Sequence, residues 1–338
     1  MSLLNCNTDQ LMWSVMIPTY RPRWDLLKET LESILKQDLG TIMEIVIVDD
    51  GTPGGPPREL LKQLAGDRVQ IAENSQNLGL TATWNRCIDL AQGKWIHILH
   101  QDDCVYDGFY KSFGDTLEAH PDAGAAFCRS RCIDEHGHVI YEESKLLDST
   151  GVLDSSLELI AMRNPIQCPA IVVKKSSYEK VGKYSDRYTF VLDWEMWLRL
   201  AASFEIVYVP DILAAFRIQS GSETSRLARN GETVRDSMKL VREYGSLIPS
   251  ERLEGVRLQA TRAVCDLAMQ KALNFASQGD GVSAMSQLRA ALRHDRRLSY
   301  WISSLRCWIA CMKSSRRLIY PPLPCPSESL SLKKARQG

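Results

Sequence analysis

Short apolar runs alternate with segments of helical periodicity over the first hundred residues of the chain. The apolar runs end at turn-forming residues and predict buried strands at 13–18, 43–51, 69–73 and 94–99. Between these runs, apolar residues recur at helical spacing in 23–37, 56–66 and 80–93. Strands that alternate with helices favour a mostly parallel sheet that helices cover on both faces. The sequence therefore predicts an α/β fold.

Polar side chains follow three of the four predicted strands. They are Thr19 and Tyr20, Asp49 and Asp50, and Asp102 and Asp103. In an open parallel sheet, ligands bind outside the carboxyl ends of the strands, which share one edge. Two neighbouring carboxylates at the end of a buried strand repel each other. The two acidic pairs therefore indicate a ligand site that receives a positive charge.

Composition and charge restrict the class of protein. The 338 residues suffice for one large domain or two ordinary ones, and 44% of them are apolar, as in globular proteins. The formal net charge is zero, which gives no sign of nucleic-acid binding. Between Gly281 and Gly338, eleven Lys or Arg stand against two Asp or Glu. This basic end is compatible with an anionic membrane surface or a partner, and equally with a solvated tail.

Several sequence features favour the cytoplasm. The first ten residues lack the basic region and long apolar run of a secretory signal. No apolar run approaches the roughly 20 residues that span a bilayer. Ten cysteines without a CxxC pair are typical of reduced thiols in a cytosolic protein. We predict a cytoplasmic protein, with peripheral contact at the inner face of the membrane as a further hypothesis.

Cys128, Cys132, His136 and His138 have the residue types of a zinc site. The same stretch also has the pattern of strand, turn and strand, with turn chemistry in residues 134–137. Both cysteines would then lie on one face of the first strand. We favour the structural hairpin, and zinc is the alternative.

The second part of the chain has a mixed pattern. Helices are expected at 107–121, 155–163 and 193–203, and strands at 167–175 and 205–218. From about residue 225 the pattern is helical to about residue 318. We therefore divide the chain into a first domain at 1–225, a helical region at 226–320 and a disordered tail at 321–338.

Two segments of the helical region have a recognisable pattern. Residues 257–292 predict a helical hairpin that resembles one tetratricopeptide-type unit, with Asp280 as the N-cap of its second helix. Residues 300–322 combine an apolar face, which includes Trp301 and Trp308, with basic neighbours. Such a helix either docks on the globular body, which we favour, or lies in a membrane interface.

Four motifs resemble the pattern of family 2 glycosyltransferases. They are VMIPTYRP, IVIVDDGTP, NLGLTATWNRCIDLAQGKWIHILHQDDCV and VLDWEMWLRLA, in the order and spacing of that family. The resemblance covers about Trp13 to Ser222. It implies the GT-A fold, a Rossmann-like and mostly parallel sheet flanked by helices, here with a C-terminal helical extension. It also implies an inverting transferase that uses a nucleotide-diphosphate sugar and a divalent cation, Mg²⁺ or Mn²⁺.

The resemblance puts the nucleotide beside the ends of the first two strands. Pro18, Thr19 and Tyr20 would line the base pocket. Asp50 would hydrogen-bond the base or the ribose, and Asp49 would support the turn. The alternative for these two aspartates is a simple Asp-Gly turn. Further donor contacts are implied for Asn77, Gly79, Asn85, His100, Gln101, Asp102 and Arg217.

Asp102 is the implied metal ligand, because a carboxylate is a hard oxygen donor that suits Mg²⁺ or Mn²⁺. The alternative is a surface turn without a ligand. The family usually has D-x-D at this place, and His100 stands at the first position. An imidazole can donate to a phosphate or ribose oxygen and can ligate some metals, but it supplies no negative charge. We therefore expect weaker metal binding, or binding that depends more on Asp102 and the donor phosphates; a plain strand-end residue is the alternative for His100.

Asp193 matches the family's catalytic aspartate at a helix start and is the implied general base. An inverting transfer needs one carboxylate that accepts the proton of the acceptor hydroxyl. The structural alternative for Asp193 is an N-cap of the helix that follows, and Glu195 is the second choice as base. Trp194 and Trp197 would form either a wall for the sugar or part of the core, which we favour.

Three residues, Arg217, Gln219 and Trp84, bear on the expected phosphate site. Arg217 matches a segment that often closes over the diphosphate, so its guanidinium could pair with phosphate oxygens. Gln219 stands where many relatives have histidine, and Trp84 where arginine is frequent. Residues 220–222 suit either a mobile lid or an ordinary linker.

Other functions fit the same fold. A non-catalytic sugar-nucleotide binder or scaffold would explain His100 and Gln219, but the presence of Asp102 and Asp193 argues against it. A nucleotidyltransferase would be expected to have a glycine-rich phosphate loop after the first strand, which PTYRPRW lacks. We expect a nucleotide-sugar donor and a saccharide, lipid-linked or protein acceptor, and no nucleic acid.

Overall fold

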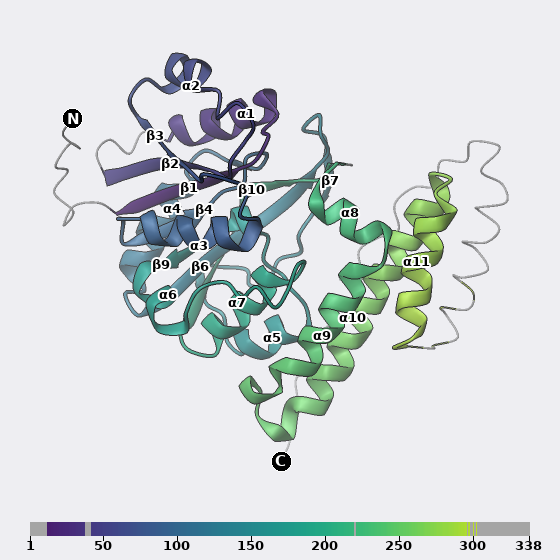
Figure 1. The fold of residues 1–338 in the computed structure, drawn as a ribbon. Helices are drawn as coiled ribbons and strands as arrows, with labels where there is room; N and C mark the ends of the chain where they lie inside the picture. Colours follow the sequence, from purple (N-terminus) through teal and green to yellow (C-terminus); the bar gives the residue numbers. More distant parts are fainter. Residues whose placement is uncertain are drawn as a thin grey trace. The chain divides into compact units, whose positions relative to one another are not determined.

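The computed structural model describes residues 12–37, 42–219, 221–295, 297, 300 and 302. The chain forms two compact units (Figure 1), one with residues 1–222 and 236–260 and the other with residues 223–235 and 261–338. This division differs from the predicted boundary after residue 225, since residues 236–260 group with the first unit. Apart from Tyr300 and Ile302, the predicted helix at 300–322 and tail at 321–338 lie outside the described residues, as does Ser220 of the predicted lid.

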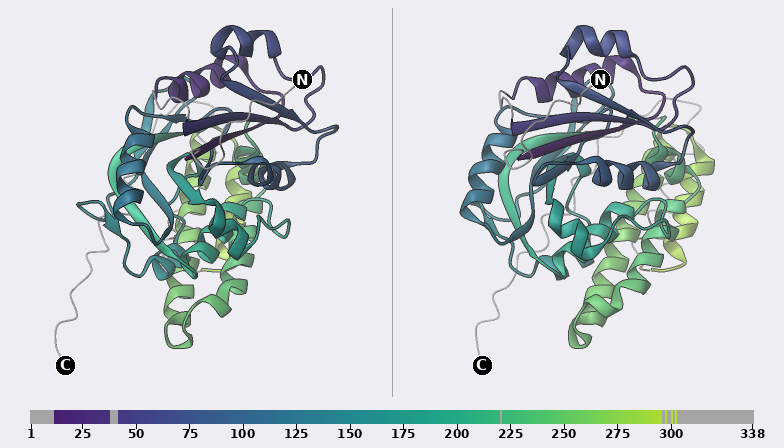
Figure 2. Two further views of the ribbon diagram at one scale, coloured as in Figure 1. Left: turned by 90° about the vertical axis from the view of Figure 1, so that its left-hand side faces the viewer. Right: turned by 60° about the vertical axis from the view of Figure 1, so that its left-hand side comes forward.

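Four parallel strands form the first half of the sheet. They are β1 (Trp13–Thr19), β2 (Met43–Asp49), β3 (Val69–Glu73) and β4 (Trp95–Ile98), in the order β3–β2–β1–β4. The helices between them are α1 (Trp24–Leu35), α2 (Arg58–Ala65) and α3 (Leu80–Leu90). Figure 2 shows α1 and α2 on one face of these strands and α3 on the other. The α/β prediction, with a largely parallel sheet flanked by helices, is confirmed.

The sheet continues with strands of both directions. β9 (Ile171–Lys174) lies antiparallel between β4 and β6 (Ala123–Ile133), and β10 (Glu205–Arg217) runs parallel to β6. Two short strands that the sequence did not predict, β5 (Cys104–Val105) and β8 (Gly151–Val152), pair antiparallel with β10. The end of β10 thereby reaches the turn after β4, where the backbone N–H of Arg217 donates to Asp103 Oδ1 at 2.8 Å.

The core of the first unit is built around β1, all seven residues of which are buried. Val15 and Ile17 of this strand share a cluster with Leu27, Leu31 and Ile34, which lie on one face of α1. Removing each such aliphatic side chain from water contributes about 1.5–3 kcal/mol. This packing fixes β1, so the loop that follows it starts from a rigid support.

The predicted hairpin is confirmed. β6 pairs antiparallel with β7 (Val139–Glu142), and Asp134 Oδ1 accepts from the backbone N–H groups of His136 and His138 in the turn. Cys128 and Cys132 are buried in the sheet, whereas both histidines are exposed. The zinc alternative therefore lacks a common site for these side chains.

Helices make up the rest of the described chain. Those before residue 222 are α4 (Phe109–Ala119), α5 (Ser156–Met162), η3 (Cys168–Ala170), α6 (Lys175–Val181) and α7 (Leu192–Ala201). Those after it are α8 (Glu223–Arg229), α9 (Glu232–Glu243), η4 (Tyr244–Leu247), α10 (Ser250–Ser277) and α11 (Gly281–Leu292). Among the described residues, none of these helices combines the length and the apolar character that crossing a bilayer requires.

The predicted helical hairpin is also confirmed, although its first helix begins earlier than residue 257. Cys265 of α10 donates its thiol to the carbonyl oxygen of Ala291 in α11 at 3.6 Å. The carboxylate of Asp280 accepts from Ser283 N at 3.0 Å, so Asp280 is the N-cap of α11.

Candidate active site

Asp49, at the end of β2, holds the turn that follows it. Its Oδ1 accepts from the hydroxyls of Thr19 at 3.1 Å and Thr52 at 2.7 Å, and its Oδ2 accepts from Thr52 N at 2.8 Å. These bonds join the ends of β1 and β2. Asp49 thus has the supporting position that the family resemblance implied.

Asp50 organises the loop that leads into α3. Its Oδ1 accepts from Asn74 Nδ2 at 2.7 Å and Leu78 N at 2.8 Å, and its Oδ2 accepts from Gly79 N at 2.9 Å. The side chain is buried. Both oxygens are therefore engaged within the chain, which leaves Asp50 to shape the loop rather than to offer an open carboxylate to a base or ribose.

The residues that follow β1 form an open surface beside this loop. Gln101 clamps Tyr20, because its Oε1 accepts from Tyr20 N at 2.9 Å and its Nε2 donates to Tyr20 O at 3.4 Å. The Tyr20 ring is 38% exposed, and the guanidinium of Arg21 lies 5.1 Å from its centre. Pro18 is buried within β1. Tyr20 is thus held at its backbone and stays partly exposed, with Arg21 over one face of its ring.

The two asparagines of the predicted donor contacts lie differently. Asn77 is exposed in the loop before α3. Asn85 is engaged with Tyr184, donating to its carbonyl oxygen at 3.0 Å and accepting from its N–H at 2.8 Å. Asn85 therefore ties α3 to the segment before α7.

The second acidic pair follows β4 and is largely buried. Asp103 is 1% exposed, and its Oδ2 lies 3.3 Å from His100 Nδ1. Asp102 accepts at Oδ2 from the side-chain amide of Gln219. Burial and the neighbouring Asp103 raise the pKa of Asp102 to about 6. A cation beside Asp102 would offset both causes of this shift.

His100 stands among three carboxylates. Burial alone would lower its pKa, but Asp103, Asp102 and Asp193 together raise it. Its ring stacks on Trp84 with centroids 5.0 Å apart and planes at 23°. Two of the three departures from the family pattern, His100 and Trp84, are therefore in contact with each other.

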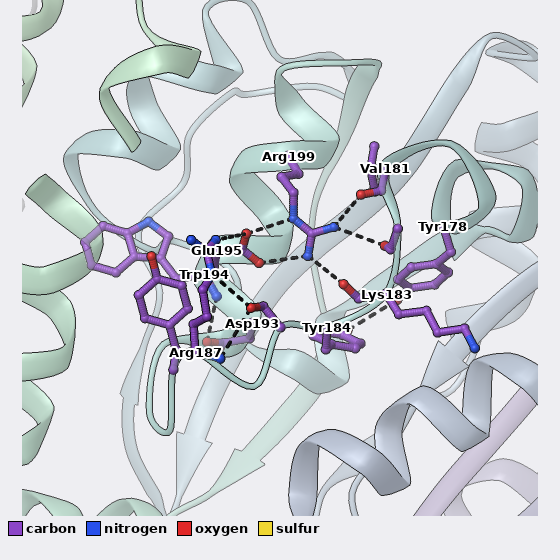
Figure 3. A network of polar contacts seen from close by, with 12 residues as sticks. Tyr178, Val181, Lys183, Tyr184, Arg187, Asp193, Trp194, Glu195 and Arg199 are labelled. Carbon is purple, nitrogen blue, oxygen red and sulfur yellow. Dashed lines mark hydrogen bonds and ion pairs between the residues drawn. The ribbon is translucent and has the colours of Figure 1, made fainter. Parts of the chain in front are cut away.

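Asp193 lies in the first turn of α7 (Figure 3), and its charge also raises the pKa of His100. Its Oδ1 accepts from Trp194 N at 2.7 Å, and its Oδ2 accepts from Asn164 Nδ2 at 3.2 Å with the thiol of Cys168 at 3.8 Å. Burial raises its pKa to about 6, against the opposing effects of the Trp194 N–H and His100. The N-cap alternative is wrong, because α7 begins at Leu192 with Val191 at the cap position.

Glu195 has no free oxygen to act as a base. Arg199 donates from Nε and Nη2 to its two carboxylate oxygens at 2.8 and 2.7 Å (Figure 3). The same guanidinium donates to the carbonyl oxygens of residues 181, 182 and 183. Trp194 and Trp197 are 4% and 2% exposed, so both belong to the core, as we favoured.

Arg217, which the sequence suggested as a phosphate contact, is engaged with other residues of the chain. Its side chain is 2% exposed and pairs with Glu29 Oε2 at 2.6 Å. It also donates to the carbonyl oxygens of Asp102 at 2.8 Å and Asp134 at 3.3 Å. The guanidinium makes its contacts within the chain, and Arg217 thereby stabilises the turn that carries Asp102.

The acidic side chains from separate elements thus converge. Asp103, after β4, lies 3.3 Å from the His100 ring, and the charges of Asp102 and of Asp193 in α7 also raise the pKa of His100. Asn164 and Cys168, which touch Asp193, were not predicted, and only Pro165 after Asn164 marked a loop there.

Comparison with known proteins finds a family model that matches the chain from β1 to the end of α5. Residues 14–162 match the family model described as glycosyl transferase family 2. The family 2 match includes both acidic pairs and ends before Asp193. An uncharacterised protein of Mycobacterium tuberculosis strain CDC 1551 is 28% identical over 253 residues, which cover 71% of this chain and 77% of that protein. The PGL/p-HBAD biosynthesis glycosyltransferase of Mycobacterium bovis BCG is 26% identical over 61% of this chain and 76% of that protein.

Solved structures with the same fold include TarS of Staphylococcus aureus. TarS 1–349 in complex with UDP-GlcNAc matches with a TM-score of 0.58 and 14% identity, over 84% of this chain and 91% of that chain. The longer TarS structure matches with a TM-score of 0.61 and 13% identity over 90% of this chain, which spans only 55% of that chain. At this identity the likeness concerns the fold.

Proposed function

We propose that this chain is an inverting glycosyltransferase that moves a sugar from a nucleoside-diphosphate sugar to an acceptor hydroxyl. The observation that carries the proposal is that Asp103 lies 3.3 Å from His100, and that the charges of Asp102 and Asp193 also raise the pKa of His100. Two of these carboxylates lie in the family 2 match, and the relatives named as glycosyltransferases support the class of reaction.

Asp193 is the general base in this proposal. Its carboxylate takes the proton of the acceptor hydroxyl as that oxygen bonds to the anomeric carbon. The bond from the anomeric carbon to the phosphate oxygen breaks, and its electron pair leaves with the nucleoside diphosphate. Attack from the face opposite the leaving group inverts the anomeric centre. Asn164 and Trp194 N hold the two oxygens of Asp193 during this step.

Asp102 suits a divalent cation, although the chain offers few ligands. Its carboxylate is desolvated and repelled by Asp103, and a cation would relieve both effects. Among the described residues, no three His, Cys, Asp or Glu side chains form a metal-binding cluster. Mg²⁺ is commonly held by one or two carboxylates together with substrate phosphates. When bound, Mg²⁺ or Mn²⁺ would neutralise charge on the departing diphosphate.

The exposed Tyr20 ring, fixed at its backbone by Gln101, would stack on the base of the donor. Binding of UDP-GlcNAc by the TarS structure supports UDP-GlcNAc as the first donor to test. The acceptor is a saccharide, a lipid-linked sugar or a protein, and peripheral membrane contact through residues 300–322 stays a prediction. A thermal-shift panel of nucleotide sugars with Mn²⁺ would select the donor.

Replacing Asp193 tests the proposed function. We expect Asp193→Asn to lower turnover of the selected donor about 10³-fold, because the amide cannot accept the proton. Donor affinity, measured by calorimetry, should stay within about twofold, since Asp193 faces the acceptor. The control is Asp115→Asn on the exposed face of α4, where the Asp115 side chain is 71% exposed. Normal turnover of Asp193→Asn would remove Asp193 from the mechanism.

One contact favours the alternative of a non-catalytic sugar-nucleotide binder. The Gln219 amide occupies one oxygen of Asp102, the carboxylate that a cation would need. A chain that binds nucleotide equally well with and without Mn²⁺, and releases no nucleoside diphosphate with any acceptor class, would support this alternative.

A further inference from the structure

The start of α7 has no cap of its own. Helix α7 carries Asp193 in its first turn, and the cap residue Val191 makes no side-chain hydrogen bond to the helix. The first backbone N–H groups of a helix lack partners within the helix and need other acceptors. Helix α9, about forty residues further along the chain, supplies one for the residues before α7.

Asp236 of α9 holds the segment that enters α7. A single oxygen, Oδ2, accepts from three successive backbone N–H groups, those of Thr189 at 3.0 Å, Phe190 at 2.7 Å and Val191 at 3.1 Å. Hydrogen bonds to an ionised acceptor are among the stronger ones in proteins. Three of them on consecutive residues fix the path of the backbone at this point.

Two further residues of α9 extend the contact. Lys239 Nζ donates to Arg187 O at 2.7 Å, and the hydroxyl of Tyr188 donates to Glu243 Oε2 at 2.6 Å. Asp236, Lys239 and Glu243 stand three and four residues apart, so they share one face of α9. This face, which we call the α9 clamp, engages every residue from 187 to 191. Residues 236–260 belong to the same compact unit as Asp193.

We propose that the α9 clamp positions Asp193, so that α9 is part of the catalytic apparatus although it lies outside the family 2 match. This inference rests on the proposed function of Asp193. A base must lie within hydrogen-bond reach of the acceptor hydroxyl, and a misplacement of about 1 Å can cost about 100-fold in rate. Asp236 is a positioning residue in this account, since it touches the backbone before α7 and not the substrate.

The test uses the full chain with Asp236→Ala, Asp236→Asn and Asp193→Asn. In Asp236→Ala we expect amide hydrogen exchange in residues 187–194 to become at least about tenfold faster, because three backbone N–H groups lose their hydrogen-bond acceptor. Turnover should fall at least about tenfold, with the KM of the donor within about twofold. The acid limb of the pH profile should move to lower pH as Asp193 gains access to water. Asp236→Asn keeps a carbonyl oxygen as acceptor and should recover most of the turnover.

A matched control separates positioning from loss of stability. Asp280→Ala removes a carboxylate that caps α11 through Ser283 N and should destabilise the chain to a similar degree. Turnover and exchange in residues 187–194 should be those of the wild type. If Asp236→Ala fails to fold, Tyr188→Phe removes one contact to Glu243 and should lower turnover about threefold with faster exchange in 187–191.

The outcomes distinguish the two proposals. Suppose that Asp193→Asn is inactive. Wild-type turnover and hydrogen exchange in Asp236→Ala would then overturn the positioning role of the α9 clamp. The same result in Tyr188→Phe would do so if that variant replaces Asp236→Ala. Wild-type turnover in Asp193→Asn would instead overturn the proposed function. Equal losses of turnover in Asp236→Ala and Asp280→Ala would assign the effect to stability and contradict positioning.

Discussion

Asp102 and Asp193 are aspartates with a raised pKa, yet their surroundings suit them to different tasks. Asp102 stands beside a second carboxylate, Asp103, and its burial adds to the same shift. Asp193 owes its shift to burial, and a neutral amide and a backbone N–H hold its oxygens. A carboxylate crowded by a like charge favours a cation, whereas a buried one poised near neutrality favours proton transfer.

The pKa of Asp193, about 6, predicts an acid limb in the pH profile of turnover. The base must be ionised, so activity should be present above pH 6 and fall about tenfold per unit below it. Stability should depend on pH in the opposite direction to turnover. Because the folded state raises this pKa from 3.8, the free energy of unfolding should fall as pH rises from about 4 to about 6. Turnover measured from pH 5 to 8 checks the first part, and turnover that does not change across this range would contradict it.

Asp102→Asn should abolish the metal dependence of nucleotide binding. The amide keeps the shape but loses the charge that attracts Mg²⁺ or Mn²⁺, so affinity for UDP with Mn²⁺ should fall at least about tenfold. Calorimetry with UDP, with and without Mn²⁺, makes the comparison. Exposed Asp122 provides the control variant Asp122→Asn. Unchanged Mn²⁺-dependent affinity in Asp102→Asn would exclude Asp102 as the ligand.

Sequence reasoning reached single residues only where their role is local. Asp49 and its turn follow from the neighbouring Gly51 and Thr52, so their contacts were foreseeable. The roles expected for Glu195 and Arg217 depended on which charged side chains lie nearby in space. Arg199 and Glu29 decide those roles, and no periodic pattern encodes such pairs.

At the scale of elements, α7 is held by contacts on two sides of its first turns. Arg199 joins Glu195 of α7 to three carbonyl groups at the end of α6 and just after it. The α9 clamp holds the segment before α7. Strand and helix positions in the parallel half were predictable because hydrophobic periodicity determines them. The side-chain contacts of Arg199 and of the α9 clamp were not predictable, since they join residues far apart in the sequence.

Arg199→Met should lower the free energy of unfolding by about 3 kcal/mol. The substitution leaves the Glu195 carboxylate, 9% exposed, without its close partner, with Arg187 3.9 Å away, and removes the donors of three carbonyl groups. Chemical denaturation measures the change. Lys111→Met removes an exposed pair with Asp115 and should cost less than about 0.5 kcal/mol. Equal effects of the two substitutions would show that the Arg199 network adds no stability.

At the scale of the whole chain, the site combines residues from distant parts of the sequence. In the proposed function, residues within the family 2 match at 14–162 would bind the donor, residues 164–195 supply Asp193 and its neighbours, and residues 236–243 supply the α9 clamp. The predicted boundary after residue 225 separated the clamp from the domain that it serves. Helical periodicity continues from α8 through α11, so the sequence held no signal that residues 236–260 group with the sheet.

A crystal structure of the full chain with UDP and Mn²⁺ would test the central claim most directly. Anomalous scattering locates the manganese ion independently of the model. We predict manganese at about 2 Å from an oxygen of Asp102 and from diphosphate oxygens, the uracil against Tyr20, and Asp193 facing the open side of the β-phosphate. Manganese and UDP bound away from Asp102, with Asp193 on another face of the molecule, would contradict it.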